Sequence, residues 1–352
     1  MNNVVLISSV VLMSVFVSAA FGFWRITQQP FYRPGMVSTA RNLRFPLAPP
    51  VQTGDPDYWQ VEPDIQLCHF SRGGGRNVLV IHGGPGTPFR EPISALEPLT
   101  GDYRFHYYDQ RGCGKSTRPI NRFTSPNTYR NMSGLDRTLG LGAQIADIER
   151  IRRILGDEKL ILIGHSWGGF MASLYAAEFP EHVEALILVS PATTLVMPLK
   201  EPDFYAVARA RLKLDQRAEY DAFMADYWDI KTLFSRSEAD LAALNARFAE
   251  RYIMPLEKDI AVKRGETGGW MTWAMYISMG RRHDYRAALK KVGAPVLVLY
   301  GESDLLSEAA TRQYAASFPN AGFAVIKNAG HFSFEQQPEQ FTKLMADYLH
   351  VK

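Results

Sequence analysis

The stretch that decides the fold reads LILIGHSWGGF and covers residues 160–170. Its apolar start, Lys159–Ile163, lies between polar borders and predicts a buried parallel strand. Trp167–Glu178 follows as a predicted helix. Between them lies Gly-x-Ser-x-Gly, centred on Ser166. A sharp strand-to-helix turn strains the nucleophile's backbone, and side chains two positions to either side would collide, so glycine is required there. The alternative to a nucleophilic Ser166 is a structural glycine-rich turn.

A serine hydroxyl needs a base, and the base needs an orienting carboxylate. In this architecture the chain order is Ser, then Asp or Glu, then His. Of the late histidines, His350 is at the C-terminus, whereas His331 lies in a loop between a strand and a helix. Asp304 follows the predicted strand 295–300, and Glu302 is the fallback because both positions can reach the sheet edge. The alternative is two polar loops with unrelated roles.

The attacked carbonyl becomes an oxyanion and needs preset donors. One predicted donor is the backbone N–H of Trp167, directly after the nucleophile. The second is expected in the loop HGGPG, residues 82–86, where glycines let the backbone approach a substrate. We assign it to Gly84, with Gly83 as the alternative. His82 is interpreted as a structural histidine that hydrogen-bonds this loop.

Strands and helices alternate along the chain, which predicts an α/β fold with a mostly parallel central sheet and helices on both faces. Tyr58–Phe70 and Asn77–Ile81 flank a glycine-rich break and are expected to form a hairpin. A helical, aromatic segment interrupts the alternation and predicts an inserted cap over the carboxyl ends of the strands. The predicted division is a core of residues 57–191 and 294–352, with the cap at 192–293.

The N-terminus carries a membrane signal at residues 1–24. Val4–Trp24 has no charge and is long enough to span a bilayer core at about 1.5 Å per residue. The alternatives are an exported chain, cleaved after the small residues 18–20, and a buried helix. The side of the membrane stays open, because the following arginines favour the cytoplasm whereas an export signal favours the outside. Residues 25–56 are rich in proline and predict an extended strap, or an irregular segment packed on the body.

The composition excludes several classes of function. A net charge of +3 in 352 residues is too small for a nucleic-acid-binding surface. Two cysteines make neither a disulfide framework nor a cysteine-rich zinc site. No metal or organic cofactor is expected, and the expected partner is a small-molecule or short-peptide substrate.

Three motifs together carry a family resemblance: HGGPG at 82–86, DQRGCGKS at 109–116 and GHSWGG at 164–169. They resemble the proline iminopeptidase family of α/β-hydrolases. The resemblance implies cleavage of an N-terminal residue, often proline, from a peptide whose free amine is held by acidic cap residues. It also implies that residues 109–116 form a structural loop at the pocket rim.

This sequence departs from the family pattern twice. His165 replaces the usual glycine before the serine, and the cap segment WMTWA at 270–274 lacks the usual glutamate. Four other cap acids are candidates to hold the amine, although each also fits a solvated surface charge: Glu201, Glu257, Asp259 and Glu266.

The sequence therefore predicts a membrane-tethered or exported serine hydrolase. Ser166 attacks an acyl carbonyl, His331 takes and returns the proton, and Asp304 holds the imidazole, while Gly84 and Trp167 bind the oxyanion. The alternatives to an aminopeptidase are a carboxylesterase with an apolar cap pocket and a non-catalytic binding protein.

Overall fold

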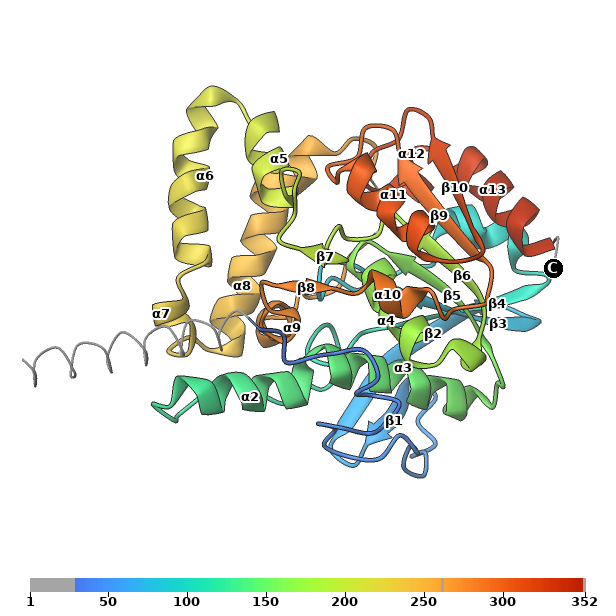
Figure 1. Ribbon diagram of the computed structural model, residues 1–352, viewed down its shortest axis with the longest axis horizontal. Coiled ribbons are helices and arrows are strands. Elements are labelled where there is room, and N and C mark those ends of the chain that lie inside the picture. Colours follow the sequence, from blue (N-terminus) through green and yellow to red (C-terminus); the bar gives the residue numbers. More distant parts are fainter. Residues whose placement is uncertain (1–28, 261–262, 351–352) are drawn as a thin grey trace, which may run out of the picture.

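The computed structural model describes residues 29–260 and 263–350. Its centre is an eight-stranded sheet of strand order β1-β2-β4-β3-β5-β6-β9-β10 (Figure 1). The strands from β4 to β10 in that order are parallel, and β1 and β2 form an antiparallel edge. The strands are β1 (Tyr58–Glu62), β2 (Ile65–Gly73), β3 (Arg76–Ile81), β4 (Tyr103–Tyr108), β5 (Leu160–His165), β6 (Val183–Val189), β9 (Val296–Gly301) and β10 (Ala321–Ile326).

The sheet is covered by helices on both faces. These helices are α2 (Thr128–Leu139), α3 (Leu141–Leu155), α4 (Trp167–Glu178), α11 (Glu308–Ser317), α12 (Ser333–Gln336) and α13 (Pro338–His350). Successive side chains of a strand point to opposite faces, so an all-apolar strand fills two cores. In β3, Leu79 and Ile81 join the core under α3, α4 and α11, whereas Val78 and Val80 join the core under α13. The predicted α/β class, with a mostly parallel sheet and helices on both faces, is confirmed.

The predicted hairpin between 58–70 and 77–81 is wrong. The hairpin is instead formed by β1 and β2, and β4 lies between β2 and β3. Gly73 and Gly75, with φ of +97° and +83°, carry the chain past the backbone that precedes β4. A side chain at Gly73 would meet Thr100 O at 2.8 Å, so the break is a crossing point rather than a tight turn.

A long insertion separates β6 from β9. It contains α5 (Phe204–Arg211), α6 (Leu214–Tyr227), α7 (Ile230–Leu233), α8 (Glu238–Phe248), α9 (Trp270–Met279), α10 (Arg286–Leu289) and the short paired strands β7 (Val196–Met197) and β8 (His283–Asp284). Helices α5 to α8 form a lobe beside the sheet, on the left in Figure 1. Aromatic rings hold this lobe together, as in the perpendicular contact of Tyr205 with Trp228 at 5.2 Å.

Residues 29–56 pack on the body without forming a helix or strand. Tyr32 and Val37 are buried in the main core. The Glu178 carboxylate, at the end of α4, accepts hydrogen bonds from the Tyr32 hydroxyl and from the Gly35 and Ser38 backbone N–H groups, all at 2.8–2.9 Å. One buried acid therefore holds the turns of this segment.

The predicted membrane segment, residues 1–24, lies outside the described residues. Within 29–260 and 263–350, no helix combines the length and the apolar character needed to cross a bilayer.

Candidate active site

Ser166 lies at the tight turn between β5 and α4. Its backbone has φ +54° and ψ −119°, a conformation that L-residues rarely adopt. Two backbone hydrogen bonds hold the turn: Ser166 N–H donates to Val189 O, and Ala192 N–H donates to Ser166 O, both at 2.9 Å. The strain is thus imposed by β6 and the loop after it, and the turn presents Ser166 at the carboxyl edge of the sheet.

Glycines surround this turn because no side chain would fit. A Cβ on Gly164 would meet the Gly169 Cα at 2.7 Å, and a Cβ on Gly168 would meet His82 O at 2.7 Å. On the facing loop, a Cβ on Gly83 would lie 2.8 Å from the Ser166 Cβ. These contacts explain why positions 164 and 168 need glycine, as predicted. They also show that the HGGPG loop lies against the predicted nucleophile.

Asp304 and His331 are hydrogen-bonded to each other. His331 Nδ1 lies 2.9 Å from Asp304 Oδ1, and both side chains are buried. The Leu306 backbone N–H donates to the same Oδ1 at 2.9 Å. Asp304 Oδ2 is buried with no hydrogen-bond partner in the described chain. An acceptor at Oδ1 assigns the proton to Nδ1, which leaves Nε2 of His331 free to act as a base.

His165 connects the serine turn to the histidine loop. Its Nε2 lies 2.9 Å from the His331 carbonyl oxygen, and the two rings are 4.8 Å apart. Burial holds the pKa of His165 well below its usual value, so it is neutral and donates this hydrogen bond from Nε2. The contact brings the backbones of Ser166 and His331 to adjoining positions. In the described chain the Ser166 hydroxyl makes no hydrogen bond, so a Ser166–His331 bond has to form when the site becomes active.

The electrostatics of His331 favour a protonated intermediate. Burial alone would lower the pKa of His331, but the charge and hydrogen bond of Asp304, with help from Glu257, raise it above the ordinary value of 6.5. Glu257 reaches this loop from the cap insertion, and its carboxylate oxygens lie 3.3 and 3.4 Å from the His331 backbone nitrogen. Burial in turn raises the pKa of Glu257, partly offset by His331.

Glu302, the fallback acid, points elsewhere. Its side chain is exposed and accepts hydrogen bonds from Lys327 Nζ at 2.7 Å and from the Asn328 backbone N–H at 3.1 Å. The Glu302 carboxylate is therefore paired at the surface, whereas the Asp304 side chain is buried.

The acid loop is also held from the cap. Arg211, at the end of α5, donates to Ser303 O at 2.9 Å and to Asp304 O at 2.5 Å. Sequence reasoning missed this residue, because nothing distinguishes Arg211 from the other cap arginines until α5 docks on the loop.

The predicted oxyanion donors occupy two neighbouring backbone segments. Gly84 has φ +118°, and a Cβ there would meet Gly86 N at 2.7 Å, so only glycine fits. Trp167 begins α4, where the helix dipole favours negative charge. The assignment of Gly84 rather than Gly83 stays a prediction.

His82 supports this loop from below. Its Nδ1 lies 2.9 Å from Gly83 O, and its Nε2 accepts from the Gln110 backbone N–H at 3.2 Å. Burial lowers the pKa of His82 to about 4, so it stays neutral at physiological pH. These bonds match the structural interpretation of His82 and tie the HGGPG loop to the rim loop at Gln110.

Helix α9 of the insertion packs on the same loop. Thr272 Oγ1 donates to Pro85 O at 3.1 Å, and the Trp167 ring contacts Tyr276 at 5.4 Å. Trp270 and Trp273 are buried in the hydrophobic core. The WMTWA segment is therefore part of the hydrophobic core and contacts the predicted oxyanion loop.

Of the four candidate cap acids, Glu257 is the one that contacts a predicted catalytic residue in the described chain. Glu266 has a side chain that is 87% exposed and lies 3.6 Å from Arg118. Asp259 is exposed, and Glu201 has one carboxylate oxygen buried without a hydrogen-bond partner.

Comparison with known sequences identifies relatives over most of the chain. A proline iminopeptidase from Heyndrickxia coagulans is 26% identical over 288 residues, 79% of this chain and 91% of that protein. One from Lactobacillus delbrueckii subsp. bulgaricus is 26% identical over 285 residues, 77% of this chain and 89% of that protein.

Solved structures share the fold. A thermophilic esterase from Thermogutta terrifontis superposes with a TM-score of 0.53 at 23% identity, covering 85% of this chain and 96% of that one. Proline iminopeptidase from Mycobacterium smegmatis gives 0.53 at 19% identity, covering 82% and 96%. The similarity to the two proline iminopeptidase sequences supports a hydrolase here. The alpha/beta hydrolase fold family matches residues 76–338, a span that includes Ser166, Asp304 and His331. The chain belongs to the alpha/beta hydrolase fold family.

Proposed function

We propose that this protein is a serine hydrolase that cleaves an acyl bond through Ser166, His331 and Asp304. The observation that carries the proposal is the buried Asp304–His331 hydrogen bond at 2.9 Å. His165 ties this histidine loop to the strained turn that holds Ser166. His331 Nε2 takes the proton as Ser166 Oγ attacks the carbonyl, and Asp304 stabilises the resulting imidazolium. The N–H groups of Gly84 and Trp167 receive the oxyanion. The imidazolium then protonates the leaving group, and water releases the acyl group by the reverse sequence.

We further propose an aminopeptidase of the proline iminopeptidase type. A substrate with a free N-terminal ammonium needs a nearby carboxylate, because an unpaired buried ion costs several kcal/mol. Glu257 supplies that charge next to His331. The relatives named proline iminopeptidase support the same substrate class.

The test compares a prolyl arylamide with a p-nitrophenyl ester. In Glu257→Gln the amide oxygen still accepts from the His331 backbone N–H, so the variant removes mainly the charge. We expect kcat/KM for the arylamide to fall at least about 30-fold, as for the loss of a charged partner of about 2 kcal/mol, and the ester to change much less. Glu266→Gln, at a largely exposed side chain, is the matched control. Equal loss on both substrates, or ester turnover with no arylamide turnover by the native protein, contradicts the aminopeptidase proposal.

A carboxylesterase is the second candidate, favoured by aromatic rings of α5 next to His331. Phe204 lies 6.3 Å from the His331 ring and contacts Phe248 at 6.4 Å. Tyr205 continues this cluster from the same helix, at 5.4 Å from Phe248. Such a wall suits an apolar acyl or alcohol group. The outcome of the substrate comparison decides between the two.

We also propose that residues 1–24 anchor the chain to a membrane. The support is the uncharged run of residues 4–24. Fractionation of cells that express the full chain tests this proposal. We expect the protein in the membrane fraction, where it resists extraction with alkaline carbonate. Recovery in the soluble fraction with residue 4 still present contradicts the proposal.

A further inference from the structure

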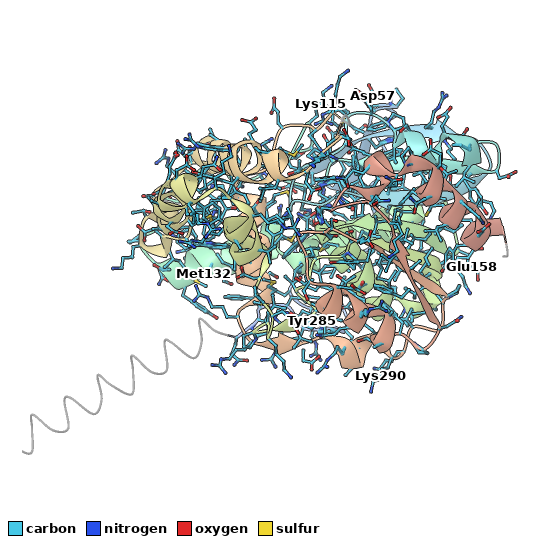
Figure 2. The ribbon with its side chains drawn as sticks, turned by 90° about the horizontal axis from the view of Figure 1, so that it is seen from above. Asp57, Lys115, Met132, Glu158, Tyr285 and Lys290 are labelled. Atoms are coloured by element: carbon cyan, nitrogen blue, oxygen red, sulfur yellow. The ribbon has the colours of Figure 1, made fainter. Side chains whose placement is uncertain are left out.

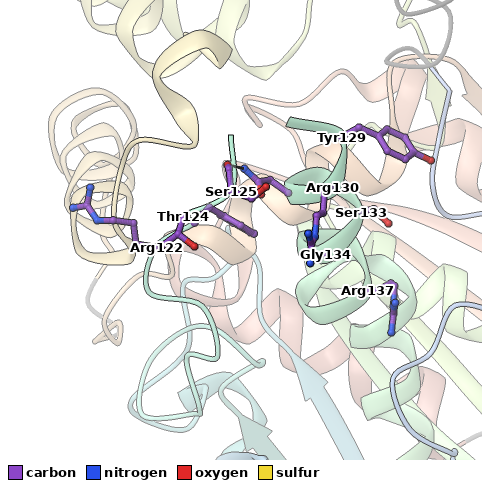
Figure 3. A pocket seen from close by; sticks show the side chains of 10 residues that line it. Arg122, Thr124, Ser125, Tyr129, Arg130, Ser133, Gly134 and Arg137 are labelled. Atoms are coloured by element: carbon purple, nitrogen blue, oxygen red, sulfur yellow. Dashed lines mark hydrogen bonds between the residues drawn. The ribbon is translucent and has the colours of Figure 1, made fainter. Parts of the chain in front are cut away.

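Helix α2 carries arginines that no carboxylate neutralises. Arg130 and Arg137 lie seven residues apart, two helical turns, and therefore on one side of the helix. Both are exposed, and neither has a carboxylate within 4 Å in the described chain. Figure 3 shows them with Arg122, from the loop before α2, around one open cleft of about 710 Å³. The Arg122 guanidinium lies 3.7 Å from the Asp240 carboxylate.

The segment that enters the body from the N-terminus runs along the same helix. The Phe31 ring lies 6.1 Å from the Tyr129 ring, and Asn42 Nδ2 donates to Asp136 Oδ2 at 2.7 Å. A second, smaller hollow beside α2 is lined by Arg41. We call Arg41, Arg122, Arg130 and Arg137 the α2 arginine face.

The charge of this face is one-sided in the sequence as well. Residues 29–44 contain no acid, and residues 121–142 contain only Asp136, which is buried. A surface with several arginines and one exposed acid at its margin, Asp240, attracts anions. Tyr129, 53% exposed, adds an aromatic ring of the kind enriched at membrane interfaces.

The position of residue 29 indicates what the α2 arginine face binds. Gln29 and Pro30 contact Gly280, and Phe31 rests on Tyr129, so residue 29 enters the body at this face. The sequence just before it is the uncharged run of residues 4–24, followed by Arg25. An apolar segment in a bilayer would hold the α2 arginine face within a few residues of the headgroups. Arginines next to such a segment bind anionic lipid, and each is worth about a fivefold gain in membrane partition.

We propose that the α2 arginine face docks on an anionic lipid surface. This inference rests on the membrane anchor proposed above, and not on the hydrolase site. The docked face holds the body in one orientation, with phosphate groups of the lipid at Arg130 and Arg137.

The experiment uses the full chain, reconstituted in vesicles of neutral phosphatidylcholine or of phosphatidylcholine with about a third phosphatidylglycerol. A polarity-sensitive fluorophore is attached at Ser133→Cys, between the two arginines on α2, in a Cys68→Ser background. Cys113 is buried. We expect a blue shift and a rise in intensity on the anionic vesicles alone, lost in 0.5 M KCl because salt screens the attraction.

The variant Arg130→Glu/Arg137→Glu is compared with Arg104→Glu/Lys159→Glu, which makes the same change of charge at exposed positions at the amino ends of β4 and β5. Lys159 follows Glu158, which Figure 2 shows far from Met132 of α2. The α2 variant is expected to lose the fluorescence shift, with at least about a 25-fold weaker partition to anionic vesicles wherever partition is reversible. The control variant is expected to keep both.

Several results overturn the proposal. One is an equal shift on neutral vesicles, and another is an equal loss in the control variant. A third is no shift on anionic vesicles although the chain floats with them, which means anchoring without docking. A shift produced by millimolar inorganic phosphate in the absence of lipid, with no further change on vesicles, identifies a soluble phosphate ligand instead. Ester turnover measured on the same samples separates a failure here from a failure of the hydrolase proposal.

Discussion

Replacing Asp304 with asparagine tests the electrostatic part of the proposed triad. Both His331 Nδ1–H and the Leu306 N–H point at Oδ1, so an asparagine oxygen there keeps the geometry. The negative charge is lost. For unit charges about 4 Å apart at an effective dielectric of about 20, the imidazolium loses about 4 kcal/mol of stabilisation, which corresponds to about a 10³-fold lower kcat.

The assay is steady-state hydrolysis of a p-nitrophenyl ester, with circular dichroism and thermal unfolding to verify the fold. The asparagine NH₂ takes the place of Oδ2, which is buried without a partner, so a loss of about 1–3 kcal/mol of stability accompanies the change. Glu302→Gln, two residues away with an exposed side chain, is the matched control and should stay within about twofold of the native rate. The reasoning is refuted if Asp304→Asn keeps more than a tenth of the native kcat, or if Glu302→Gln loses as much.

Three further predictions follow from the same geometry. The pKa of His331 is raised above 6.5 and the base must be neutral, so kcat/KM should fall as pH drops through a midpoint above 6.5. Glu257→Gln removes a charge that raises this pKa and should move the midpoint down. An upward move contradicts the account. Gly83→Ala adds a Cβ 2.8 Å from the Ser166 Cβ and should lower kcat/KM for the ester more than about 100-fold. The melting temperature checks that the variant still folds. Native-like turnover would show that the loop moves aside freely. His165→Ala leaves the His331 carbonyl unpaired and should lower the urea-measured free energy of unfolding by about 1–3 kcal/mol, an expectation that an unchanged unfolding midpoint disproves.

The elements around the serine could be predicted because their pattern is local. The apolar run of β5 and the glycines at the turn identify a buried strand that enters a helix, and α4 spans Trp167–Glu178 as expected. Helix α2 was not anticipated, because its sequence TYRNMSGLDRTL is polar and contains Gly134. Its buried positions, Met132, Leu135 and Leu139, pack into the main core, so tertiary contact stabilises a helix of weak propensity.

The predicted strand pairing was wrong, because strand pairing is not determined by local sequence. Nothing near residues 70–77 indicates that β4, some thirty residues later, inserts between β2 and β3. In the candidate site, too, local sequence predicts some residues and not others. Chain order and loop position pointed to Asp304 and His331, whose hydrogen bond the structure contains. The contacts of Arg211 and Glu257 depend on how the insertion docks, and no local pattern separates them from other cap charges.

Labelling with a fluorophosphonate tests the central claim most directly, because the probe phosphonylates only a serine that a neighbouring base activates. In the folded full chain we expect one modified peptide, carrying the adduct on Ser166, and labelling at least about 100-fold slower in His331→Ala. No adduct on Ser166, or labelling at the same rate without the histidine, would contradict the account.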